Sequence, residues 1–395
     1  MFRRKREPLT QRLLKAVREK AAAADAAAVD AASLHTHVLQ QLSEQHLELL
    51  LLAVERDGAR TCCVPARRGA TTSVDAASST YCCCATPGDD ESPPASGASR
   101  TAEEKPYQSP HVLCCQAFRW PELQDTTQLR RLPQCTTLEC CNPFHYSKVC
   151  GPESPPPPYR RYPYEKLRPE DRAPSEESLT TNKISYTTSP NCSSISNFSL
   201  RSSFSTNGEG SEQTDEWCKL AYWEQQHRIG DLFSVRSPSV HVFGGPAKPG
   251  MVSAALCLTD LVPKYPGVPI EPSAPIKKTR SKIADGVLIS QEGDTVWAYN
   301  LSECPMFVNS PTLDDLHSRS LVVYKLPPGY CQRIFSWERA ELRRKVNARS
   351  ENTLGPENTY SVRISFAKGW GPKYARQEIT VCHCWLEVLL TKPAR

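Results

Sequence analysis

Hydrophobic positions follow two different periods along this chain, and the N-terminal part has the period of helices. Apolar side chains recur at roughly helical spacing from Leu34 to Ala53. This spacing predicts a helix that begins at the cap Ser33 and ends at Gly58, and it follows a shorter basic helix over residues 9–20. The pattern indicates helices that form the core of a small domain.

From Glu216 onward the apolar positions occur in short runs rich in aromatic and β-branched residues, separated by turn residues. The runs cover residues 217–235, 296–310, 320–326 and 360–370. This spacing is typical of an all-β sandwich. Residues 337–350 predict one helix between strands, and the proline-containing residues 262–280 are interpreted as an insertion.

Residues 151–215 separate these two parts and contain few large apolar side chains among many Pro, Ser and Thr. Such a segment buries too little apolar surface to offset the entropy of ordering, so we expect a linker. Near its start Pro156, Pro157, Pro158 and Tyr159 match the Pro-Pro-x-Tyr pattern that WW domains bind. A polyproline II helix loses little entropy on docking, although a stiff spacer is the alternative interpretation.

Length and charge limit the class of protein. At 395 residues the chain is expected to form two or three domains. No apolar stretch reaches ~18 residues, so we expect no membrane insertion. The N-terminus has no apolar signal-peptide core, so we expect a location in the cytoplasm and nucleus. The basic residues 3–6 predict either a nuclear-localisation patch or a solvated tail.

The 18 cysteines indicate thiols or metal ligands rather than disulfides, because no secretory signal accompanies them. A thiol-dependent enzyme would need a cysteine, a histidine and an orienting group brought together. No nucleophile motif, phosphate-binding loop or acid pair stands out, so we expect no enzyme activity.

Four segments resemble Smad proteins. They are FRWPEL (118–123), CCNPFHYSKVC (140–150), AYWEQQHRIGDLFSV (221–235) and SFAKGWGPKYARQ (365–377). The first two resemble the Smad MH1 domain, and the last two resemble the MH2 domain. The resemblance implies an α+β MH1-like domain over residues 9–150 with a loop insertion near 66–110, a disordered linker over 151–215, and an all-β sandwich MH2 domain with flanking helices over 216–391.

Two features resemble the inhibitory Smads. The PPPPY run follows the MH1-like region directly, and the chain ends at CWLEVLLTKPAR without the Ser-Ser-x-Ser tail of receptor-activated Smads. The resemblance implies an inhibitor of TGF-β/BMP signalling that binds activated type I receptors through MH2 and blocks other Smads. It would recruit a WW-domain HECT ubiquitin ligase. The alternative is a zinc-containing DNA-binding transcriptional regulator or corepressor.

The resemblance also implies one structural zinc, held by Cys115, Cys135, Cys140 and His145. The five-residue step from Cys135 to Cys140 is shorter than the family pattern, so Cys141 is an alternative ligand. A set of buried reduced thiols is the alternative to a metal site.

DNA reading in related Smads uses a basic hairpin that corresponds to residues 97–110 here. This stretch has two acidic and two basic residues and no strand pattern. Because reading the major groove needs basic and amide side chains on such an element, we expect no sequence-specific DNA binding. The basic N-terminal tail would still attract DNA in a salt-sensitive way.

A second candidate site is the segment AKGWGPKYARQ, which resembles the Smad loop that contacts phosphorylated partners. Two glycines free the backbone, so we expect an exposed Trp370 on a tight loop surrounded by positive charge. The predicted partner-binding residues are Lys278, Lys282, Lys368, Gly369, Trp370, Gly371, Lys373, Tyr374 and Arg376. Taken singly, each lysine is also compatible with an ordinary solvated surface.

Overall fold

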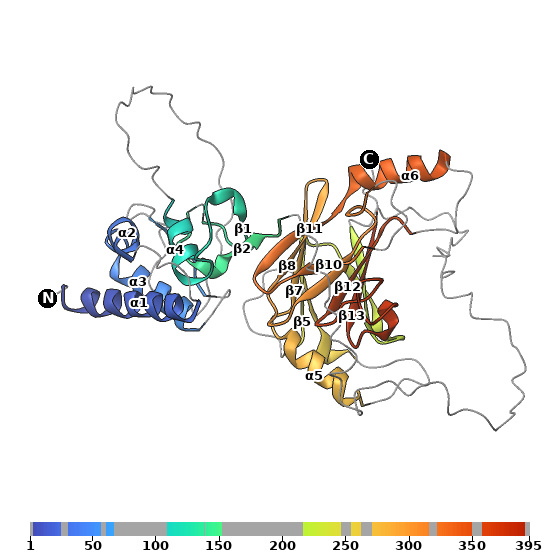
Figure 1. Ribbon diagram of the computed structural model, residues 1–395, viewed down its shortest axis with the longest axis horizontal. Helices are drawn as coiled ribbons and strands as arrows, with labels where there is room; N and C mark the ends of the chain where they lie inside the picture. The colour runs from blue at the N-terminus through green and yellow to red at the C-terminus, as the bar shows by residue number, and fades with distance from the viewer. Residues whose placement is uncertain are drawn as a thin grey trace, which may run out of the picture. The chain divides into compact units, whose positions relative to one another are not determined.

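The structure is a computed structural model of the chain (Figure 1). It describes residues 3–24, 31–56, 61–66, 109–137, 139–151, 216–245, 254–261, 271–315, 322–349 and 358–391.

The N-terminal region is mainly helical, as its apolar period predicts. Its helices are α1 (Arg3–Ala24), α2 (Ala31–Leu34), the π-helix η1 (His35–Leu39), α3 (Glu44–Glu55) and α4 (Pro110–Phe118). Helix α1 confirms and extends the helix expected over residues 9–20. Its buried residues Leu13 and Val17 pack with Leu47 and Leu50 of α3 in one apolar cluster.

The second predicted helix is broken, and its predicted cap is wrong. Ser33 lies inside α2, and the helix that follows the break begins after Ser43. The Ser43 hydroxyl accepts a hydrogen bond from the His46 backbone N–H at 3.2 Å, which satisfies one of the unpaired donors of the first turn. Gly58 lies outside the described residues.

The rest of this region is short and irregular. It comprises the 3-10 turns η2 (Thr126–Gln128) and η3 (Pro143–His145) and the antiparallel strands β1 (Leu129–Arg131) and β2 (Tyr146–Val149). A small apolar cluster that contains Trp120, Leu123 and Tyr146 also includes Cys135 and Cys140. The helices and this pair of strands make the region α+β, as the resemblance implies.

The C-terminal region is a sandwich of two sheets (Figure 1). One sheet has the order β10 (Tyr324–Leu326), β9 (Met306–Asn309), β12 (Ser361–Phe366), β13 (Trp385–Leu390), β3 (Cys218–Glu224) and β4 (His227–Val235). The other contains β11 (Tyr330–Ser336), β8 (Thr295–Asn300), β7 (Val287–Glu292), β5 (Ser239–Phe243) and β6 (Ala254–Cys257), and β2 pairs in parallel with β11. The sandwich predicted from the strand runs is confirmed.

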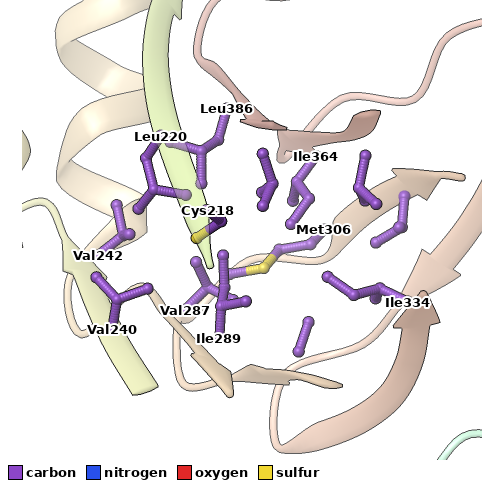
Figure 2. Packing of buried hydrophobic residues seen from close by; sticks show 14 of the residues in the cluster. Cys218, Leu220, Val240, Val242, Val287, Ile289, Met306, Ile334, Ile364 and Leu386 are labelled. Carbon is purple, nitrogen blue, oxygen red and sulfur yellow. The ribbon is translucent and has the colours of Figure 1, made fainter. Parts of the chain in front are cut away.

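The core lies between these two sheets. Figure 2 shows Leu220, Met306 and Leu386 of the first sheet pointing toward Val240 and Ile289 of the second. Each of the strands β3–β13 contributes to this core at least one side chain that is almost fully buried, and Leu326 of the short β10 is one of them. Apolar burial on this scale is what holds two sheets face to face.

Two helices accompany the sandwich. Helix α6 (Trp337–Arg349) lies between β11 and β12 in the chain, which confirms the helix expected over residues 337–350. Helix α5 (Ala274–Ile283) occupies part of the segment interpreted as an insertion, while residues 262–270 lie outside the described part. Pro275 is compatible with α5 because it lies in the first turn, where its missing N–H is not needed. In the part of the chain that the structure describes, no helix is long and apolar enough to span a bilayer.

Candidate functional site

Four side chains in the N-terminal region form a cluster that could hold a metal ion. The ligand atoms of Cys63, Cys135, Cys140 and His145 all lie within 4.8 Å of one another. The Cys63 and Cys135 sulfur atoms are 3.8 Å apart, and His145 Nδ1 is 3.5 Å from both Cys63 Sγ and Cys140 Sγ. In a tetrahedral zinc site with Zn–S bonds of about 2.3 Å, neighbouring sulfurs are about 3.8 Å apart. The donor set and spacing therefore fit a closed four-coordinate site.

Backbone pairing brings the most distant ligand to the others. The segment of residues 61–66 runs antiparallel to the chain around Cys140, with a bridge between Pro65 and Cys140. The Cys141 N–H donates to the Val64 carbonyl at 2.6 Å, and the Ala66 N–H donates to the Glu139 carbonyl at 3.1 Å. These bonds hold Cys63 beside Cys140, although the two are far apart in the sequence.

A second layer of hydrogen bonds orients the imidazole of His145. Because a carbonyl only accepts, His145 Nε2 donates to the Thr61 carbonyl at 2.8 Å, so Nδ1 is the ring nitrogen that faces the cysteines. The fully buried Asn142 supports the same backbone, since its amide donates to Thr61 Oγ1 and to the Cys62 carbonyl. Its side-chain oxygen accepts from the Phe144 N–H at 3.0 Å.

The electrostatics of the cluster favour a thiolate beside an imidazolium. Hydrogen bonds from Cys135 and Cys140 hold the pKa of the Cys63 thiol well below its usual range. Burial by itself lowers the pKa of His145, but hydrogen bonds with Cys140 and Cys63 outweigh it and raise this pKa to about 10. The Cys135 pKa is raised, first by its hydrogen bond with Cys140. A metal cation would replace these shared protons as the partner of the thiolates.

The structure does not bring Cys115 into this cluster. Its thiol is fully buried, faces the Pro143 carbonyl at 4.0 Å, and has its pKa raised by burial. Cys63 takes the fourth position instead, while Cys135, Cys140 and His145 come together as predicted. Cys141 packs with Cys114 in the helical core, so the alternative that it replaces Cys140 does not match the geometry.

The second candidate site is the loop of residues 367–378, which connects β12 with the turn before β13. The expectation of an exposed Trp370 is wrong, because this side chain is only 2% exposed. It packs in a cluster with Phe307, Val323, Ile379, Cys382 and Trp385. The indole therefore anchors the loop to the sandwich rather than contacting a partner.

The two glycines and Tyr374 shape the loop around this anchor. Gly371 has a φ of +91°, which a residue with a Cβ rarely adopts, and its N–H donates to the Arg376 carbonyl at 2.7 Å. A Cβ on Gly369 would lie 2.5 Å from the Tyr374 ring. The predicted residues Gly369, Gly371 and Tyr374 therefore have a structural role in this loop.

Helix α5 and this loop meet around the segment of residues 382–384. Thr279 of α5 lies 3.3 Å from His383 Nδ1, and the Cys384 thiol donates to the Ile276 carbonyl at 3.9 Å. On the loop side, the Cys382 thiol donates to the Lys368 carbonyl at 3.6 Å. One segment thus links the helix that bears Lys278 and Lys282 to the loop that bears Lys368.

The surface at this junction is cationic. We define it as the basic surface, formed by Lys278, Lys282, Lys368, Lys373 and Arg376. The four lysines are exposed and Arg376 is half-buried, and none of the five pairs with an acidic group among the described residues. Arg280 differs, because it forms an ion pair with Glu224, which is 5% exposed. The structure therefore brings the two elements that bear the predicted cations to the same segment, and Lys368 and Arg376 lie close enough to His383 to lower its pKa.

Other predicted sites lie outside the described residues. They are the WW-binding residues Pro156, Pro157, Pro158 and Tyr159, and most of the stretch that corresponds to the DNA-binding hairpin. Of the basic residues 3–6, Arg6 donates hydrogen bonds to the carbonyls of Leu39, Gln40 and Leu42. Arg6 therefore has a structural role, because it ties α1 to the turn that follows η1.

Comparison with known proteins agrees with the two folded regions. The MH1 domain family matches residues 31–150, and the MH2 domain family matches residues 215–391. Mothers against decapentaplegic homolog 6 of Gallus gallus is 39% identical over 364 residues, which are 90% of this chain and 73% of that protein. The chain belongs to the inhibitory Smads. Inhibitory Smads are signalling adaptors and transcription regulators rather than enzymes, and this membership supports a general role in inhibiting TGF-β/BMP signalling.

Further relatives give the same result. Mothers against decapentaplegic homolog 7 is 37% identical in Rattus norvegicus, over 93% of this chain and 80% of that protein. The Homo sapiens homolog 7 is 37% identical over 90% of this chain and 77% of that protein. The IAD domain of interferon regulatory factor 9 matches 46% of this chain with a TM-score of 0.32 and 13% identity, and no conclusion rests on it.

Proposed function

We propose that this inhibitory Smad binds the phosphorylated, activated type I TGF-β/BMP receptor through its basic surface and thereby keeps other Smads from it. The observation that carries the proposal is the set of five cations on α5 and the loop of residues 367–378, for which the described part of the chain provides no acidic partner. The action would take place in the cytoplasm, with further roles in the nucleus.

The charge arrangement supports a phosphorylated ligand. Five like charges at one junction repel one another, and a bound anion relieves that repulsion. A phosphoserine carries close to two negative charges at neutral pH and offers three acceptor oxygens, so one group can engage several of these side chains. The loop is ordered by the buried Trp370 and by its own backbone bonds, so little ordering entropy is lost on binding.

The N-terminal region has a different proposed role. We propose that one zinc ion is held by Cys63, Cys135, Cys140 and His145. Its role would be structural, because three thiolates and one imidazole fill a tetrahedral site and leave no open position for catalysis. The bound metal would neutralise the thiolates and tie the segment of residues 61–66 to the rest of the region.

The third part of the proposal is recruitment of a WW-domain HECT ubiquitin ligase through the run that ends at Tyr159. Its support is the sequence pattern, because a polyproline helix closed by tyrosine matches what WW domains bind. The activated receptor would then be brought to the ligase by one adaptor.

The receptor-binding proposal is tested with the full chain and a phosphorylated type I receptor kinase. Reversing Lys368 and Arg376 to Glu should weaken binding at least tenfold, because charge-assisted hydrogen bonds contribute about 1.5–3 kcal/mol each. Binding of the wild type should also fall as salt rises. A thermal melt checks that the variant is folded.

The matched control reverses Lys325 and Lys345, which are exposed on β10 and α6 and give the same change in net charge. This control should bind like wild type. If the control and the test variant lose affinity equally, binding depends on net charge and the proposed surface is wrong. If the test variant binds and inhibits like wild type, the receptor contact lies elsewhere.

A further inference from the structure

The two ring nitrogens of His383 have different surroundings. The Thr279 hydroxyl donates its proton to the Pro275 carbonyl at 2.9 Å, so it can only accept from His383 Nδ1, 3.3 Å away. Nδ1 therefore carries the hydrogen, and Nε2 carries the lone pair in the neutral ring. Nε2 makes no hydrogen bond with any described residue, and the side chain is partly exposed.

Helix α5, the loop of residues 367–378 and the turn between β3 and β4 all contact the segment of residues 382–384. Their charged and titratable residues include Lys278, Arg280 and Lys282 of α5, Lys368 and Arg376 of the loop, Glu224 of β3 and His227 of β4, and most of these charges are positive. The carboxylate of Glu224 is already paired with Arg280. Burial lowers the pKa of His383, and the positive charges of Arg376 and Lys368 lower it further. The imidazole is therefore neutral at pH 7 in the free protein.

We propose that His383 is a ligand-contact residue of the basic surface: its Nε2 takes up a proton from solvent when a phosphorylated peptide binds, keeps that proton, and donates a hydrogen bond to a phosphoryl oxygen. This inference rests on the proposed function and adds to it a sixth contact, which is coupled to proton binding. Thr279 is the positioning residue, because its hydroxyl fixes the hydrogen at Nδ1 and leaves Nε2 for the ligand.

The direction in which binding affinity changes with pH follows from the neutral state of His383 in the free protein. The ligand's negative charge favours the imidazolium, so the pKa of His383 rises on binding and the complex holds more protons than the separate partners. Affinity therefore rises as pH falls from 8 toward 6.5. Below pH ~6 the phosphoserine itself becomes protonated, which opposes the effect.

The experiment measures proton uptake directly. The full chain is titrated calorimetrically with a synthetic peptide that carries two phosphoserines, in two buffers with different ionisation enthalpies, at pH 6.5 and pH 8. The unphosphorylated peptide is the control for the phosphoryl group. Two variants are compared with wild type, His383→Asn and His383→Gln, and thermal melts check that both are folded.

The two variants separate contact from protonation. Asn retains a donor toward Thr279 but does not reach the ligand, so it should weaken binding about tenfold at pH 6.5 and less at pH 8. Gln can donate a neutral hydrogen bond near the position of Nε2, so the affinity of His383→Gln should lie between those of wild type and His383→Asn. On binding, wild type should take up more protons than the phosphoserines alone account for. Both variants should lose this excess.

The outcomes distinguish this inference from the proposed function. If His383→Asn binds with wild-type affinity and proton uptake, while reversal of Lys368 and Arg376 abolishes binding, His383 is not a contact and the basic surface remains the site. If wild type does not distinguish the phosphorylated peptide from the unphosphorylated one, both proposals fail.

Discussion

Replacing Cys63 with serine tests the metal cluster where the structure departs most from the sequence prediction. The variant removes one of four ligand atoms that lie within 4.8 Å of one another. Apparent free energies of structural zinc binding are about 10–16 kcal/mol, so an equal share for each ligand is about 2.5–4 kcal/mol. A loss of that size lowers zinc affinity by about 60- to 700-fold.

The matched control is Cys115→Ser, because this thiol lies in the same region, is fully buried, and is outside the cluster. The control exchanges a buried thiol for a hydroxyl, which costs about 1–3 kcal/mol of stability where the hydroxyl lacks a good partner. Both variants should therefore melt at lower temperature than wild type, but only Cys63→Ser should lose metal affinity.

The assay is zinc content by mass spectrometry, followed by competition with a chromophoric chelator, using the purified full chain. Wild type and Cys115→Ser should hold about one zinc per chain against the chelator, and Cys63→Ser should release it at far lower chelator concentration. Wild-type affinity in Cys63→Ser, or loss of zinc only in Cys115→Ser, would show that the assignment of the fourth ligand is wrong.

Four further predictions follow from other parts of the chain. Trp370→Ala should lower the free energy of unfolding by about 3–5 kcal/mol, measured by denaturant titration, because the indole is buried in its cluster. Ser43→Ala should cost about 1 kcal/mol and Ser43→Gly only a few tenths, since the hydroxyl caps α3 and glycine is a tolerated cap. Burial lowers the pKa of His46, so the unfolded chain binds the extra proton, and the loss of stability on acidification from pH 7.5 to 5.5 should be smaller in His46→Gln by thermal melt. Tyr159→Ala should abolish binding of a WW-domain ligase in a pull-down and leave phosphopeptide binding unchanged; retained ligase binding would exclude the docking role.

The sequence predicted those elements whose pattern is local. The predicted apolar runs contain β3, β4, β8, β9, β10 and β12, and the helical period gives α6, because a strand or helix buries a face that its own residues define. The runs do not include β5, β6, β7, β11 and β13. Helix α5 was not predicted because residues 262–280 were interpreted from their prolines as an insertion, whereas Pro275 lies in a first turn. The helix break before Ser43 depends on packing among α1, α3 and α4, which single-sequence periodicity does not report.

The errors at the candidate sites are failures to predict long-range contacts. Trp370 is flanked by glycines, which indicates a tight loop correctly but does not indicate that Phe307 and Trp385 cover the indole. Cys115 has the ligand spacing that the family resemblance suggests, yet the fourth thiol comes from Cys63, far away in the chain. The cysteine pair at residues 62–63 was the feature of the sequence that could have indicated a further candidate ligand. Only the pairing of residues 61–66 with the chain around Cys140 places Cys63 in the cluster.

The separation of Cys63 and Cys135 also determines where the chain tolerates extra residues. The two positions are 72 apart, and the proposed zinc would join them into one closed loop. Closure entropy grows only with the logarithm of loop length, so doubling this loop would cost about 0.6 kcal/mol, against about 10 kcal/mol or more of zinc binding. An insertion between Ala66 and Ser109 should therefore leave the cluster bound to its metal. The five-residue step from Cys135 to Cys140 has no such freedom, because both of its ends belong to the four-residue cluster that could hold the ion.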